Sequence, residues 1–225
     1  GYLKNRIVNQ DIKMDELVVK AREKQPGLIV VDRAVHGKNQ NYLTPENRVP
    51  EKPLPYPWES CIIAGGGWSY SFDAKYMSGR EAIHTLVDIV AKGGNLLLNI
   101  APSPEGEWDA GAYKLLNEIG DWMAVNKEAI YGTRSMAPFK FDNVCVTAKT
   151  DGTVYLTYLV EKGQTELPSE ILFSDYVPKK GAKVQLLGSK QKLKWTQKSN
   201  GMAIQLPKEL WGKLLNTEAF VVSIK

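Results

Sequence analysis

The residues with the clearest potential for acid–base chemistry surround Glu59. Trp58 precedes this carboxyl group and the apolar run Cys61–Ile63 follows it closely. A carboxyl group among aromatic and apolar neighbours loses hydration, which raises its pKa and keeps it protonated at neutral pH. Such a group suits a general acid. The alternative interpretation of the same residues is a solvated Glu at the start of a strand.

Three further residues could bind a ligand near this carboxyl group. Arg33 follows an apolar run and Asp32, so it could hold an anionic or hydroxyl-rich ligand or simply pair with a carboxylate. His36, three residues later, is a weaker candidate for the same site. Trp68 follows three glycines, and this pattern suits either an aromatic wall for a sugar ring or an anchor in the core.

Few residues in the chain could hold a metal or a cofactor. The 225 residues contain two His and two Cys, too few for a disulfide framework or a structural zinc site. Cys61 and Cys145 are interpreted as buried thiols. No Gly-x-Gly-x-x-Gly motif follows an expected strand, and there is no P-loop. The sequence therefore predicts no metal and no cofactor.

Charge and hydropathy argue against nucleic-acid and membrane partners. The net charge is +4, and residues 139–225 hold 13 Lys, eight acidic residues and no Arg. Nucleic-acid-binding proteins rely on Arg side chains, so a Lys-only basic surface favours a role in solubility. No apolar run approaches the ~20 residues that span a bilayer. We expect neither partner.

The elements that would position these residues alternate between helices and apolar strands. Apolar spacing predicts a helix over residues 14–21 capped by Asp11, and Ser78 with Glu81 forms a capping-box pattern before a second helix. Asp109 is expected to cap a third. Apolar runs at 28–31, 58–63 and 95–100 predict buried parallel strands. Three strands are too few to close an eight-stranded barrel. In folds built from parallel strands and helices, catalytic groups lie at the carboxyl ends of the strands.

The pattern changes after Pro138. Asp151-Gly152 and Asn200-Gly201 mark hairpins, and short apolar runs predict an antiparallel β-sandwich. The expected strands cover residues 144–147, 154–160, 171–173, 184–187, 193–197, 202–206 and 219–224. We therefore predict two domains, residues 1–137 and 138–225.

Several blocks of the first domain resemble the α-L-fucosidases of glycoside hydrolase family 29. The resemblance covers residues ~10–135 in order and rests on residues 25–33, 41–46, 57–61, 86–100 and 126–133. It implies the C-terminal half of a (β/α)8-like catalytic domain followed by a β-sandwich. It also implies a retaining hydrolysis of terminal α-L-fucosyl linkages on oligosaccharides or glycoconjugates, by an Asp nucleophile and a Glu general acid/base.

The resemblance assigns roles to individual residues. It places the general acid/base at Glu59 and a fucose contact at Arg33, with Trp68, Trp58 and His36 as further substrate-binding residues. The nucleophile of the family falls at or just before Gly1, so we expect a C-terminal fragment that is inactive alone. Family members are commonly secreted or periplasmic, although no signal peptide begins this chain.

Two other functions fit the same sequence. The chain could be a non-catalytic carbohydrate-binding or scaffold fragment, with Trp195 and Trp211 on the second domain as binding residues. The unclosed sheet also predicts self-association or pairing with the missing N-terminal half, because open strand edges pair readily.

Overall fold

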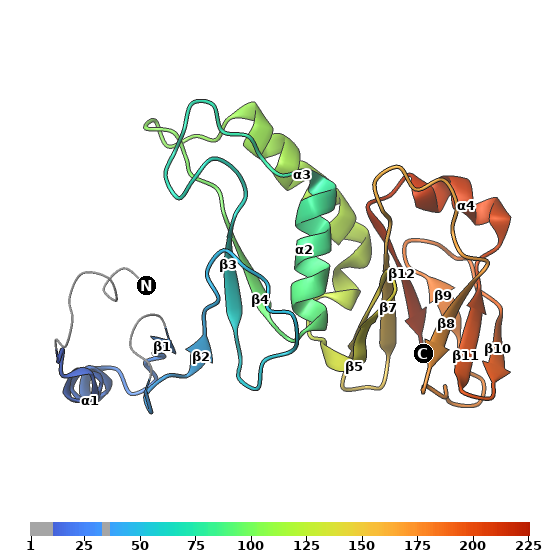
Figure 1. Cartoon of the computed structure of the whole chain (residues 1–225), viewed down its shortest axis with the longest axis horizontal. Helices are drawn as coiled ribbons and strands as arrows, with labels where there is room; N and C mark the ends of the chain where they lie inside the picture. Colours follow the sequence, from blue (N-terminus) through green and yellow to red (C-terminus); the bar gives the residue numbers. More distant parts are fainter. Residues whose placement is uncertain (1–10, 33–36) are drawn as a thin grey trace.

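The structure is a computed structural model that describes residues 11–32 and 37–225. A first part with parallel strands and three helices precedes an antiparallel β domain (Figure 1). The first part contains α1 (Met14–Lys24), β1 (Val31–Asp32), β2 (Tyr42–Leu43), β3 (Glu59–Ile63), α2 (Gly79–Ala91), β4 (Asn95–Asn99), α3 (Ala110–Asn126) and the 3-10 turn η1 (Lys127–Ala129). Among the described residues, no helix is long and apolar enough to cross a membrane.

The first helix, α1, differs from its prediction at its start. The N-cap is Lys13, in the left-handed region at φ 53°, and no side chain caps the helix. Asp11 instead accepts a hydrogen bond from the Lys13 backbone N–H at 2.9 Å, so the predicted Asp11 cap is wrong. Val18 is buried, but Leu17 of the same predicted stripe is 53% exposed. Met14 and Ala21 are partly buried, so Leu17 is the exposed member of the predicted stripe.

The strands of the first part pair in parallel, as predicted, but their predicted burial is wrong for two of the three runs. The 28–31 run becomes a strand only at Val31, with Ile29 66% exposed, and Leu97 of β4 is 44% exposed. β1 pairs with β2, and β3 pairs with β4 from Glu59↔Asn95 to Ile63↔Asn99. Two isolated parallel bridges connect β2 and the residues after it to the β3 region. Leu43 of β2 pairs with Trp58, directly before β3, and Glu46 pairs with Cys61 of β3. The described strands form these short ladders rather than a closed barrel, so the half-barrel stays a prediction.

The two faces of β3 have different environments. Ser60 and Ile62 are buried, and Ile62 packs with Ile89 of α2. Successive side chains of a strand point to opposite faces. Glu59 and Cys61, which are only partly buried, therefore lie on the other, more open face of the sheet.

The second part contains two antiparallel sheets around one apolar core. One has the order β5-β6-β7-β12-β9 and the other β10-β11-β8, and both contribute to a cluster that includes Val146, Phe173 and Ile204. The elements are β5 (Arg134–Phe141), β6 (Val144–Ala148), β7 (Val154–Leu159), β8 (Glu170–Ser174), β9 (Val184–Leu186), β10 (Trp195–Lys198), β11 (Gly201–Gln205), α4 (Lys208–Leu215) and β12 (Ala219–Ile224). Both predicted hairpins are present. The predicted boundary at 137/138 falls inside β5.

Helices α2 and α3 pack against the five-stranded sheet and join the two parts (Figure 1). Ile83 and Trp122 share a buried cluster with Tyr155 of β7. The indole N–H of Trp122 donates to the Ala219 carbonyl at 2.8 Å, and His84 contacts the Glu218 carbonyl at 2.8 Å. The β domain therefore packs against α2 and α3, the two helices that follow the loops after β3 and β4.

Candidate active site

Glu59, the predicted general acid, is the first residue of β3 and pairs with Asn95, the first residue of β4. Both residues therefore lie at the amino edge of the parallel pair. Glu59 is therefore not among the groups at the carboxyl ends, where such folds gather their chemistry. A cavity of about 690 Å³ opens near this amino edge, and Asn95 lines it whereas Glu59 does not.

Trp58 lies in the core and not beside the Glu59 carboxyl group. Its side chain is 1% exposed and packs with Ile62 and Ile89 beneath the sheet. The indole N–H donates to the Lys92 carbonyl at 3.4 Å. Because neighbouring residues of an extended chain point to opposite sides, the indole does not desolvate Glu59. Trp58 offers no open ring face to a sugar, so its role here is packing.

Two of the other three predicted binding positions, Arg33 and His36, lie outside the described residues. Their assignment to fucose binding stays a prediction. Asn41 donates its backbone N–H to the Val30 carbonyl at 2.7 Å. This bond holds Asn41 beside the residue that precedes β1.

Trp68, in contrast, lies at the carboxyl edge of the sheet. It belongs to the loop that follows β3 and is 45% exposed. Asn99, the last residue of β4, donates its side-chain amide to the carbonyls of Gly67 and Trp68, at 3.4 and 3.5 Å. The prediction that Trp68 binds substrate stays open, and the structure brings it to the edge where such folds place their chemistry.

The structure also brings an unpredicted carboxylate toward that edge. The bridge between Glu46 and Cys61 places Glu46 level with the middle of β3, two residues beyond Glu59 toward the carboxyl edge. Asn47 fixes this segment, because its N–H donates to the Cys61 carbonyl at 2.8 Å and its side-chain oxygen accepts from the Ile63 N–H at 3.3 Å. Glu46 is exposed. Glu46 belongs to the 41–46 block that resembles the fucosidases, and this block was the sequence signal that could have identified it.

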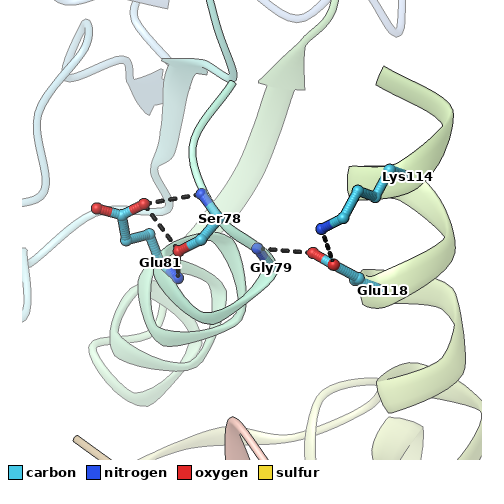
Figure 2. A network of polar contacts seen from close by, with 5 residues as sticks. All are labelled: Ser78, Gly79, Glu81, Lys114 and Glu118. Carbon is cyan, nitrogen blue, oxygen red and sulfur yellow. Dashed lines mark hydrogen bonds and ion pairs between the residues drawn. The ribbon is translucent and has the colours of Figure 1, made fainter. Parts of the chain in front are cut away.

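A polar network fixes the chain where the β3 loop enters α2 (Figure 2). Ser78 and Glu81 form the predicted capping box, with the Ser78 N–H donating to Glu81 at 2.7 Å. Glu118 of α3 accepts the Gly79 N–H at 3.0 Å and forms an ion pair with Lys114. The Lys114 hydrogen bond, with a smaller effect of the Gly79 N–H, holds the pKa of Glu118 below its ordinary value. These contacts hold the end of the β3–α2 loop at the start of α2.

A second contact joins this loop to the β4 loop. The Tyr76 hydroxyl donates to the carboxylate of Asp109 at 3.1 Å, and Asp109 also caps α3 through the Ala112 N–H at 2.9 Å, as predicted. Burial, together with this bond to a carboxylate, raises the pKa of Tyr76. The two loops at the carboxyl edge are thus connected to each other and to both helices.

Within residues 11–32 and 37–225, no group of three or more His, Cys, Asp or Glu is placed to hold a metal ion. The Cys145 thiol is buried in the junction between the two parts, and burial raises its pKa to about 11. A protonated, enclosed thiol is a poor nucleophile.

In the C-terminal domain, the two tryptophans that could have bound glycans contact the protein itself. The indole N–H of Trp195 donates to the Ala182 carbonyl and that of Trp211 to the Leu206 carbonyl, both at 3.1 Å. Both rings also pack against the core of the domain. Their geometry favours structural anchoring over sugar binding.

Together, these features define an α/β module whose loops meet at one sheet edge, joined to an antiparallel β domain. The family profile described as Alpha-L-fucosidase matches residues 1–128, and that described as Alpha-L-fucosidase C-terminal domain matches residues 141–225. The chain belongs to the α-L-fucosidase family, within the glycoside hydrolases.

Individual relatives agree with this family. Human plasma alpha-L-fucosidase is 34% identical over 184 residues, which cover 76% of this chain and 38% of that protein. The chain thus spans about two-fifths of the length of the curated relatives it matches.

Solved fucosidase structures share the fold. Alpha-L-fucosidase isoenzyme 1 of Paenibacillus thiaminolyticus has a TM-score of 0.78 at 23% identity, over 93% of this chain and 52% of that one. A Bacteroides thetaiotaomicron GH29 enzyme, trapped as a covalent intermediate in a Glu→Gln mutant, has a TM-score of 0.75 at 19% identity over 93% and 51%.

Proposed function

We propose that this chain supplies the C-terminal part of a retaining exo-α-L-fucosidase that releases terminal fucose from oligosaccharides or glycoconjugates. The observation that carries the proposal is the match of two adjacent fucosidase profiles to residues 1–128 and 141–225. The covalent intermediate of the Bacteroides relative supports a retaining mechanism. The occurrence of plasma enzymes among the relatives supports a secreted or periplasmic location.

The mechanism requires two carboxyl groups about 5–5.5 Å apart. An acid donates its proton to the glycosidic oxygen while a carboxylate attacks the anomeric carbon and forms a glycosyl ester. The first group, now a carboxylate, then takes a proton from water, whose oxygen displaces the ester and releases fucose. We propose that the nucleophilic Asp lies outside the 225 residues, since the relatives extend well beyond the matched part.

Two carboxyl groups of this chain compete for the role of proton donor. The resemblance assigns the role to Glu59, and that assignment stays a prediction. Glu46 is the second candidate, because its bridge to Cys61 brings it toward the carboxyl edge, whereas Glu59 begins β3 at the amino edge. Catalytic groups of parallel α/β folds gather at carboxyl ends, so strand geometry favours Glu46.

The proposal is tested by comparing the purified 225-residue chain with the full-length gene product. We expect fucose release from 4-nitrophenyl α-L-fucoside by the full-length protein and none by the 225-residue chain. Turnover by a verified monomer of the chain would show that it contains both carboxyl groups. Absence of turnover in a folded full-length protein would contradict the fucosidase assignment.

A further inference from the structure

The two loops at the carboxyl edge and the first turn of α3 expose several aromatic rings. Phe72 is 87% exposed, Tyr113 50%, Trp68 45% and Trp108 40%. We call these four residues, together with Tyr70, the aromatic platform. Large exposed apolar patches mark binding sites or interfaces.

The platform is built from two edge-to-face pairs. Tyr70 and Phe72 have ring centroids 5.3 Å apart at 77°, and Trp108 and Tyr113 have centroids 5.9 Å apart at 69°. An edge-to-face pair orients both rings but leaves ring faces uncovered. The rings are therefore held in position while part of their surface faces solvent.

The two pairs belong to connected segments. Tyr76, four residues after Phe72, donates its hydroxyl to Asp109, which lies directly after Trp108. Figure 1 shows the β3–α2 and β4–α3 loops side by side at the same end of the sheet. The Asn99 amide holds Trp68 at this end as well. The platform thus adjoins the edge at which the proposed reaction would occur.

The polar side chains around the platform indicate the charge of its ligand. Residues 64–78 and 100–109 carry four carboxylates, at Asp73, Glu105, Glu107 and Asp109, and one cation, at Lys75. This excess of negative charge disfavours sialylated or sulfated glycans, acidic lipids and nucleic acids. Pyranose rings, by contrast, have an apolar C–H face that stacks on aromatic rings and hydroxyl groups that carboxylates can bind.

We propose that the aromatic platform binds the neutral sugars to which fucose is attached, so that the enzyme prefers uncharged fucosylated oligosaccharides. This inference rests on the proposed function and extends it from fucose to the leaving group. Trp68 would face the sugar nearest the scissile bond, and the two ring pairs would hold the sugars beyond it.

The direct test needs no catalytic activity. Lactose, a neutral disaccharide, is titrated into the 225-residue chain and followed by saturation-transfer NMR, with 3′-sialyllactose as the charged comparison. We expect lactose contacts that the double variant Phe72→Ser/Trp108→Ala loses, and weaker contacts from the sialylated sugar. The variant Tyr131→Ser, which removes a ring that is 67% exposed between α3 and β5, is the matched control and should keep lactose binding. Equal lactose signals from all three proteins would overturn the proposal.

Kinetics on the full-length protein separate this inference from the proposed function. The double variant should lower kcat/KM for 2′-fucosyllactose about tenfold, since two stacking contacts are lost. It should leave kcat/KM for α-L-fucosyl fluoride, whose leaving group has no ring, unchanged. Equal losses on both substrates would indicate a structural effect, and no loss on either would mean that other sequence covers the platform. Both results overturn the inference, whereas an inactive parent protein refutes only the fucosidase assignment.

Discussion

Replacement of Gly94 by Ala tests the packing that holds β3 and β4 in place. A Cβ at position 94 would lie 2.4 Å from Cε2 and Cζ2 of the Trp58 ring. The ring cannot swing away, because it is 1% exposed and its N–H donates to the Lys92 carbonyl. Overpacking of a core typically costs ~1–3 kcal/mol. Since the clash involves fused ring atoms next to backbone, we expect about 3 kcal/mol.

The assay is urea unfolding of the 225-residue chain, followed by tryptophan fluorescence. For a chain of this size, a loss of this order lowers the urea midpoint by about 1 M. Gly120→Ala is the matched control, because position 120 lies in α3 and a Cβ there meets nothing within 4 Å. Better helix propensity should stabilise that variant by up to ~1 kcal/mol. A Gly94→Ala protein as stable as the parent would refute the position of Trp58 described here.

Two further substitutions test the loop support and the open sheet face. Glu118→Gln should destabilise the chain by about 1 kcal/mol at pH 7, because it weakens the carboxylate contacts with Lys114 and Gly79. The pKa of Glu118 is lowered in the folded state, so this contribution is complete above the ordinary value of 4.5 and disappears as pH falls through the lowered pKa. A urea-midpoint difference that grows on acidification would contradict this assignment. Leu97→Asp should increase the monomer fraction in light scattering, because Leu97 is 44% exposed on a strand of the unclosed sheet, whereas Leu172→Asp, at 56% exposure in the β domain, should not. Equal effects of the two would argue against association through that sheet.

Local signals predicted the helices and hairpins well. The Ser78–Glu81 capping box and the Asp109 cap form as expected, since each depends on side chains within three residues of the helix start. The Asp11 cap failed because Lys13 takes the N-cap in a left-handed conformation. Helix α4 and strand β5 were missed, because packing on the β domain, rather than a local start signal, defines them.

The candidate site was harder to predict, because it depends on which end of a strand a residue occupies. Trp58 and Glu59 are adjacent in sequence, yet one lies in the core and the other on the open face. The approach of Glu46 to Cys61 joins residues fifteen positions apart through pairing that no local pattern shows. Motif blocks in the sequence therefore indicate the family. The positions of the site residues depend on strand register, which only the structure shows.

The proton donor is the central question, and a pair of variants answers it most directly. In the full-length protein, Glu46→Gln and Glu59→Gln are compared on 2′-fucosyllactose, which needs acid assistance, and on α-L-fucosyl fluoride, whose leaving group needs little. Strand geometry predicts that Glu46→Gln loses at least a hundredfold in kcat/KM on the oligosaccharide and far less on the fluoride, while Glu59→Gln keeps the parent's ratio between the two substrates. A substrate-dependent loss in Glu59→Gln, with Glu46→Gln unchanged, would contradict the geometric argument and restore the assignment made from sequence.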